Sequence, residues 1–177
     1  MFYRLLFASL WYILPAYIAN ASACVFGGGT PLDLGKNFVD GRRIIGDGVT
    51  YKGSVFGIVC GTLVGLIQGI LVDSNVFNSL DFYGTVLDHV ILAFFLSTGA
   101  IVGDAMGSFI KRRLNIERGK PAPLLDQLDF VIGALVFGYL VAPIPHEMII
   151  IICLFTVFIH LLGNIIAYKL GIKDVWW

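Results

Sequence analysis

The stretch GSVFGIVCGTLVGLIQGILV, residues 53–72, contains no charged side chain and decides the fold class. A helix needs about 20 apolar residues to cross the hydrocarbon layer of a bilayer. The stretch does not alternate between apolar and polar residues, which is the period expected of a barrel strand. Because a segment in lipid must satisfy its own backbone hydrogen bonds, we predict a membrane-spanning helix here.

Other apolar runs extend this pattern along the chain. The predicted spans are residues 5–26, 53–72, 85–110, 128–144 and 147–168. Composition agrees, since 58% of the residues are hydrophobic and 14% are charged, whereas soluble domains carry about 25% charged residues. We predict an all-α fold: a polytopic membrane protein of about five transmembrane helices, forming a single membrane-embedded domain over residues 1–177.

Basic residues are confined to alternate connections. They gather in residues 31–52 and 111–127, whereas residues 73–84 and 145–146 contain none. By the positive-inside rule, the two basic loops and the C-terminus are cytoplasmic and the N-terminus is outside the cell membrane. Residues 21–23, Ala-Ser-Ala, also resemble a signal-peptidase site, but cleavage there would reverse this orientation, so a retained first span is the simpler interpretation.

The overall charge gives no indication of a nucleic-acid partner. Twelve Lys and Arg residues balance twelve Asp and Glu residues, so only their distribution along the chain is informative. Single histidines with no second ligand at metal spacing are predicted to be hydrogen-bonded packing residues. These are His89, His146 and His160.

Glycine recurs at every fourth residue in two of the predicted spans. Helices associate in lipid where small residues allow their backbones to approach closely. We therefore expect the second and third spans to be in tight contact. The two stripes are Gly53, Gly57, Gly61, Gly65 and Gly69 in the second span, and Gly99, Gly103 and Gly107 in the third.

An acidic residue, Asp104, lies inside the third span. An ionisable group at membrane depth is costly, which makes it a functional candidate. Ser108 and Lys111 follow at spacings that place all three on one helical face, descending toward the cytoplasm. A purely structural ladder of polar side chains within the helix is the alternative interpretation.

Two further carboxylates, Asp126 and Asp129, share a face at the start of the fourth span, just after the second basic loop. They either compensate the dipole of the helix N-terminus or join Asp104 in a metal site. Mg²⁺ prefers a few carboxylates completed by phosphate oxygens and water. Next to the basic loop they indicate a site for a metal-bound nucleotide, with Lys111 also catalytic.

The first basic loop alternates glycines with charged residues. Asp40-Gly41 and Asp47-Gly48 are turn signals. Glycine backbones and neighbouring cations are suited to binding phosphate groups. Binding of anionic lipid head groups is the alternative for Arg42 and Arg43.

The motifs in these two loops are similar to those of a known family. Residues 108–112 (SFIKR), Lys120 and residues 126–129 (DQLD) resemble the signature of membrane CTP:phosphatidate cytidylyltransferases. The first loop resembles that of the short archaeal members of this family, the CDP-archaeol synthases. The resemblance to them covers essentially the whole chain. The motifs that carry this resemblance are GKNF at 35–38, DGRR at 40–43, GDG at 46–48 and TYKG at 50–53.

This resemblance implies a Mg²⁺-dependent transfer of a cytidylyl group from CTP to 2,3-bis-O-geranylgeranyl-sn-glycerol 1-phosphate. It implies that Asp126 and Asp129 hold the metal together with Asp104, which replaces a carboxylate that the bacterial and eukaryotic signature has after the lysine, where this chain has Pro121. The residues expected to bind CTP and the lipid phosphate are Lys36, Asn37, Asp40, Arg42, Arg43, Asp47, Gly48, Thr50, Lys52, Ser108, Arg112 and Lys120.

Two rival functions are weaker. A CDP-alcohol phosphotransferase needs an Asp-Gly-x-x-Ala-Arg motif, which residues 40–43 do not supply. A channel or transporter would place polar groups along a path across the bilayer, whereas here the charged groups crowd one face.

Overall fold

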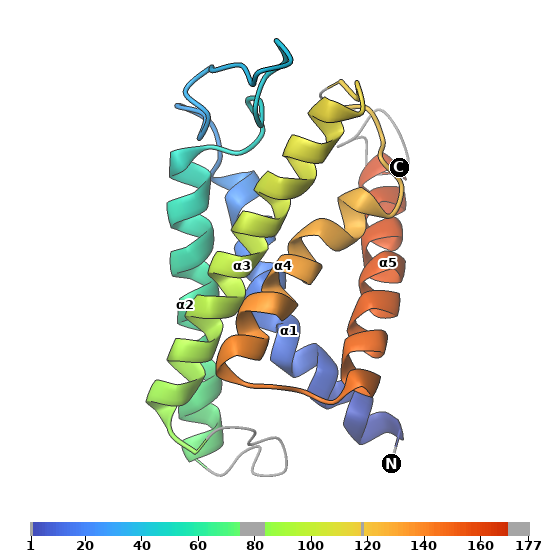
Figure 1. The fold of residues 1–177 in the computed structure, drawn as a ribbon. Coiled ribbons are helices and arrows are strands. Elements are labelled where there is room, and N and C mark those ends of the chain that lie inside the picture. Colours follow the sequence, from blue (N-terminus) through green and yellow to red (C-terminus); the bar gives the residue numbers. More distant parts are fainter. Residues whose placement is uncertain (1, 75–83, 118, 170–177) are drawn as a thin grey trace.

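The computed structural model describes residues 2–74, 84–117 and 119–169. Over these residues the chain forms five helices, which confirms the predicted all-α fold (Figure 1). Predictions that concern residues 75–83, Arg118 and the tail from residue 170 lie outside the described residues. The helices are α1 (Phe2–Val25), α2 (Tyr51–Asp73), α3 (Val86–Arg113), α4 (Leu125–Val141) and α5 (His146–Lys169).

Over the described residues, three helices are long and apolar enough to cross a membrane: α1, α2 and α3. Helix α5 has 24 residues and includes the apolar stretch His146–Leu162. Helix α4 has 17 residues, which at 1.5 Å per residue rise about 26 Å. That length is at the lower limit for a spanning helix, and α4 begins with the carboxylates of the expected site.

Helix α1 contacts all four other helices and lies at the centre of the bundle. Pro15 stands inside it, and because proline has no N–H, the carbonyl of Trp11 one turn earlier loses its intrahelical donor. Gln68 of α2 donates its amide to this carbonyl at 2.7 Å. Tyr12 and Tyr17 then donate or share hydrogen bonds with Ala142 and Thr156, which ties α1 to the end of α4 and to α5.

The expected tight contact between α2 and α3 is confirmed, although the two glycine stripes do not face each other. Gly65 of α2 packs on Ala93 and His89 of α3, whereas the first half of the α2 stripe also lies against α1. The α3 stripe instead faces α4, where Gly99 and Gly103 contact the backbone of Gly133. Glycine meets glycine there, and α3 and α4 make the most extensive contact among the described helices.

Both basic loops lie at the same end of the bundle. Figure 1 shows the segment between α1 and α2, drawn in blue to cyan, at the end of the bundle where α3 ends and α4 begins. Helix α5 also ends there, at Lys169, whereas α1 begins at the opposite end. This is the arrangement that the alternation of basic connections predicts, whichever side of the membrane the loops occupy.

Candidate functional site

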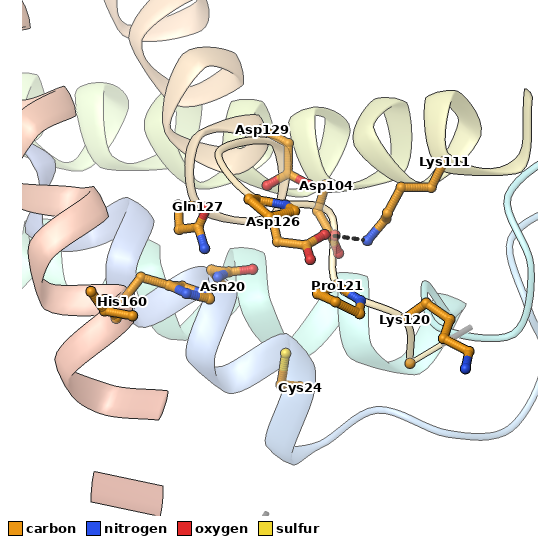
Figure 2. Close-up of a pocket in the computed structure, with 13 residues that line it drawn as sticks. Asn20, Cys24, Asp104, Lys111, Lys120, Pro121, Asp126, Gln127, Asp129 and His160 are labelled. Atoms are coloured by element: carbon orange, nitrogen blue, oxygen red, sulfur yellow. Dashed lines mark hydrogen bonds and ion pairs between the residues drawn. The ribbon is translucent and has the colours of Figure 1, made fainter. Parts of the chain in front are cut away.

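A pocket of about 550 Å³ is lined by residues of α1, α3, α4 and α5 and of the second basic loop. We call it the site pocket. Its volume is in the range of small-molecule sites. Figure 2 shows its side chains converging from four helices. The lining residues are Asn20, Cys24, Asp104, Lys111, Gly119, Lys120, Pro121, Pro123, Asp126, Gln127, Asp129, His160 and Leu161.

One lysine and one carboxylate form the charged core of this pocket. Lys111 of α3 donates to Asp126 of α4 at 2.9 Å, and the two side chains are 20% and 27% exposed. The second oxygen of Asp126 accepts the backbone N–H of Ala122 at 2.8 Å, and Ala122 accepts the N–H of Asp126 in return. Asp126 therefore positions both the Lys111 ammonium group and the loop segment at Ala122.

Asp129 is positioned by the glycine face of α3. An added Cβ at Gly107 would collide with the Asp129 carboxylate, and one at Gly103 would collide with its backbone. The carboxylate also accepts the N–H of Phe130 at 2.7 Å. The α3 stripe thus has a role that the sequence did not indicate, because it makes room for a site carboxylate.

Ser108, which we expected beside Asp104 and Lys111, is buried and is not among the residues that line the site pocket. A smaller cavity on the other side of Asp104 is lined by Gly48 and Thr50 of the first loop. Thr50 is buried and caps α2 by accepting the N–H of Gly53 at 3.1 Å. The first loop therefore reaches Asp104 through its last residues.

The described arginines of both loops bind protein groups. Arg42 donates to the carbonyl of Arg113 at 2.7 Å, and Arg113 donates to the carbonyl of Arg43. Arg112 donates to the carbonyls of Ile45 and Ile116. These contacts fasten the first loop to the end of α3, so the predicted phosphate clamps Arg42, Arg43 and Arg112 serve in this structure as loop supports.

Arg113 adds an aromatic contact to this support. Its guanidinium lies 4.7 Å from the ring centroid of Phe109 and 5.0 Å from that of Phe38, within the range of a cation–π interaction. It also pairs with Asp40 at 3.0 Å. The first loop is therefore attached to α3 through charge, backbone and ring contacts together.

Asp33, which the sequence analysis did not single out, organises the first loop from inside. Its carboxylate is fully buried and accepts backbone N–H groups from Gly35, Ile45 and Gly46. Burial alone would raise the pKa of Asp33, but Arg43 and these N–H groups outweigh burial and hold the pKa well below its usual range. The signal was present in the sequence as an Asp two residues before a turn glycine.

The remaining candidates in the first loop lie outside both cavities. Their side chains are exposed, and the turn predicted at Asp40-Gly41 is confirmed, with Gly41 at a φ of 77°. Asn37 forms an isolated antiparallel β-bridge with Arg43, and Lys36 precedes it in the chain. This set comprises Lys36, Asn37, Asp40, Asp47 and Lys52.

The three histidines differ in their surroundings. His89 is buried and its ring contacts the Thr85 carbonyl at 3.0 Å, which confirms the packing prediction. His146 is 83% exposed beside Glu147, so the prediction is wrong there, because the residue starts α5 at the open end of the bundle. His160 lines the site pocket, which places a histidine predicted to be structural at the candidate site.

A family model for CDP-archaeol synthases (CarS-like) matches residues 2–177 of this chain. The chain belongs to the CDP-archaeol synthase family. A CDP-archaeol synthase of Methanocaldococcus jannaschii is 90% identical, with both chains covered completely. Those of Methanococcus aeolicus and Pyrococcus horikoshii are 55% and 49% identical, over 96% and 97% of this chain and 95% and 97% of theirs.

A solved structure also resembles this member of the CDP-archaeol synthase family. It is described as an intramembrane enzyme for archaeal membrane lipids biosynthesis, and it superposes with a TM-score of 0.76 and 38% identity over 88% of this chain and 92% of that chain. The likeness extends to membrane location, so the multi-pass interpretation of the helices is supported by both sequence and structure.

The donor set of the site pocket fits a magnesium ion that a CDP-archaeol synthase would share with its nucleotide. Asp104, Asp126 and Asp129 all line the pocket. Over the described ranges, no three His, Cys, Asp or Glu side chains are arranged to hold a metal by themselves. Mg²⁺ characteristically takes one or two carboxylates and completes its shell with substrate phosphates and water, so these carboxylates suit it once the triphosphate is bound.

An apolar cavity of about 270 Å³ opens on the opposite face of α3 and α4 and reaches Asp129. Met106 and Ile110 of α3 line it together with Ile132 and Phe137 of α4. In this member of the CDP-archaeol synthase family, an apolar cavity therefore lies next to the polar site pocket, and Asp129 borders both.

Proposed function

We propose that this member of the CDP-archaeol synthase family carries out cytidylyl transfer in the site pocket, with Mg²⁺ held by Asp104, Asp126 and Asp129. The reaction joins CTP to 2,3-bis-O-geranylgeranyl-sn-glycerol 1-phosphate and yields the unsaturated CDP-archaeol and pyrophosphate. The observation that carries the proposal is that one pocket gathers three carboxylates and two lysines, Lys111 and Lys120, from α3, α4 and the loop between them.

The chemistry needs no general base from the protein. A phosphate monoester has a second pKa of about 6, so the lipid phosphate is already a nucleophile near neutral pH. The obstacle is repulsion between this anion and the triphosphate. Lys111 and Lys120 neutralise part of that charge, and the ion pair with Asp126 holds Lys111 ready without reorganisation.

Orientation supplies the rest of the rate. Magnesium, when bound, withdraws charge from the triphosphate oxygens. The carboxylates on α3 and α4 fix where the triphosphate lies, and the close packing of these helices keeps their spacing constant. The apolar cavity that reaches Asp129 supports an acceptor with prenyl chains, since its walls can take hydrocarbon while its end meets the site.

A cytoplasmic site is part of the proposal and is supported by the gathering of both basic loops at one end. In a cysteine-free variant, a cysteine at Val39, which is 93% exposed, should react with an impermeant maleimide only in inverted vesicles. A cysteine at the exposed Gly84, beyond the other end of α3, should react only in right-side-out vesicles. The reverse pattern would contradict the proposed orientation.

The activity is tested by release of labelled pyrophosphate from γ-labelled CTP by the purified protein in detergent. We expect release only with the geranylgeranylated glycerol phosphate and Mg²⁺, and none with ATP. Equal release with phosphatidate would broaden the acceptor class. Lipid-independent release, or none from folded protein, would refute the transferase mechanism in this pocket.

A further inference from the structure

The site pocket has two ends that differ in chemistry. Its charged end is formed by Asp104, Lys111 and Asp126, which the transfer reaction uses. Its other end carries neutral polar side chains from three different helices: Asn20 of α1, Gln127 of α4 and His160 of α5. Figure 2 shows Gln127 and Asn20 extending toward one another, with His160 next to Asn20. The mechanism described above leaves this neutral end unexplained.

The amide of Gln127 has hydrogen-bonding capacity that the protein does not satisfy. Its oxygen is shielded from solvent and accepts no hydrogen bond from the part of the chain that the structure describes. Buried polar groups are nearly always paired, so an unpaired one calls for a partner from outside the chain. The neighbouring residue along α4 is Asp126, so this unsatisfied amide stands directly beside the charged end.

The two ends are also close enough for one small ligand. On α1, Asn20 lies four residues before Cys24, which borders both Asp104 cavities. Four residues of helix rise about 6 Å. A nucleotide with its phosphates at Lys111 and Asp126 would therefore extend its sugar along this turn of α1 and bring its base to Asn20 and Gln127.

The chemistry of the ligand decides between the two substrates. Beyond its phosphate, the lipid acceptor offers ether oxygens and hydrocarbon, none of which donates a hydrogen bond. Cytosine offers an amine donor next to a ring-nitrogen acceptor and a carbonyl. An amide carries both a donor and an acceptor, so it can pair with such an edge. The neutral end suits the base and has no counterpart in the lipid.

We propose that Asn20 and Gln127, with His160 beside them, form the nucleobase subsite of the pocket and select cytosine through its amine. The assignment rests on the proposed function, because it takes the charged end as the phosphate end. UTP carries a carbonyl in place of the cytosine amine. Its carbonyl oxygen would face the amide oxygen of the protein, and both accept hydrogen bonds, unless the amide group rotated by about 180°. Sites that hydrogen-bond a substrate group reject analogues that lack it.

The test compares Gln127→Met and Asn20→Ala with the intact protein in two measurements. Equilibrium binding of CTP and UTP to the full-length protein in detergent with Mg²⁺ needs no turnover. Steady-state kinetics then gives separate KM values for CTP and for the lipid. We expect each variant to weaken CTP binding and raise its KM by about tenfold, to reduce the preference for CTP over UTP, and to leave the KM for the lipid unchanged.

Asn115→Gly is the matched control. This exposed asparagine lies outside both cavities and has a φ of 60°, a conformation that glycine adopts readily. It should bind CTP and UTP as the intact protein does. Melting temperatures of all the variants show whether they remain folded, and Gln127→Glu, which keeps the size of the side chain but removes its donor, replaces Gln127→Met if that variant fails to fold.

The outcomes separate this proposal from the proposed function. If the intact protein turns CTP over but folded Asn20 and Gln127 variants keep its CTP affinity and nucleotide preference, the subsite assignment is wrong and the mechanism stands. If they change only the KM for the lipid, the neutral end holds the glycerol part and the assignment is also wrong. If the intact protein binds CTP through Gln127 but releases no pyrophosphate, the subsite survives and the transferase mechanism fails.

Discussion

Arg43 donates to both oxygens of the fully buried Asp33 carboxylate, at 2.7 Å and 3.2 Å. The same guanidinium reaches the exposed Asp47 at 2.8 Å. A bidentate pair fixes geometry as well as charge. Because Arg113 then binds the Arg43 carbonyl, this pair transmits the position of the first loop to the end of α3, two residues beyond Lys111.

Replacing Asp33 should disorder the first loop. Asp33→Asn removes the charge that Arg43 and the backbone N–H groups of Ile45 and Gly46 share, so we expect a lower melting temperature and faster tryptic cleavage after Lys36. Asp47→Asn is the matched control, because it removes an exposed partner of the same arginine. Equal effects of both substitutions would contradict the central role of Asp33.

The same carboxylate predicts a pH dependence. The pKa of Asp33 is lower in the folded chain than its usual value of about 3.9. Its contribution to stability is therefore fully present above about pH 4 and is lost as the pH falls toward the lowered pKa. Amide exchange at Ile45 and Gly46, corrected for intrinsic rates, should stay protected down to about pH 4 and lose protection below it. Loss of protection between pH 7 and 5 would be incompatible with this assignment.

Gly107→Ala should impair turnover by displacing Asp129. The new Cβ would overlap both the carboxylate and the Cβ of Asp129, so the side chain must turn and α4 must shift slightly at this position. We expect a fall in kcat of about 100-fold, as is typical for a misplaced catalytic group, in a protein that still folds. Gly84→Ala, where nothing lies within 4 Å, should have wild-type kcat; a similar kcat in both variants would refute the role of this contact.

Asp104→Asn should alter the magnesium requirement. Loss of one charged ligand should shift the activity curve to higher Mg²⁺ concentrations and lower its maximum, whereas EDTA should abolish turnover of the intact protein. Asp73→Asn, at the far end of α2, serves as control. An unchanged magnesium curve for Asp104→Asn would remove Asp104 from the proposed ligands.

Much of the fold could be read from the sequence because lipid leaves few alternatives to helices. The five apolar runs predicted five helices, and α2, predicted at 53–72, extends from Tyr51 to Asp73. The partner of each glycine face was harder to predict. A stripe at spacing four shows that a helix face is small, but not which neighbour it meets, and Gly103 turned out to face Asp129 on α4.

The candidate site divides in the same way. Asp104, Lys111 and Asp126 were predicted because charges in or beside apolar runs are conspicuous, and the structure brings them to one pocket. The arginines of the first loop were as conspicuous, yet Arg42 binds a backbone carbonyl and Arg43 binds the carboxylates of Asp33 and Asp47, partners that no sequence pattern displays. Asn20 was missed because a single amide inside an apolar run carries no spacing signal.

The contact of Gly99 and Gly103 with Gly133 limits how this enzyme can admit a lipid. Where two backbones touch without side chains between them, no change of side-chain rotamer can open a gap. Helices α3 and α4 can therefore separate only by losing their whole interface. The proposed acceptor therefore cannot enter by parting α3 from α4, whereas α5, which packs against its neighbours far less extensively, is the more weakly held wall of the pocket.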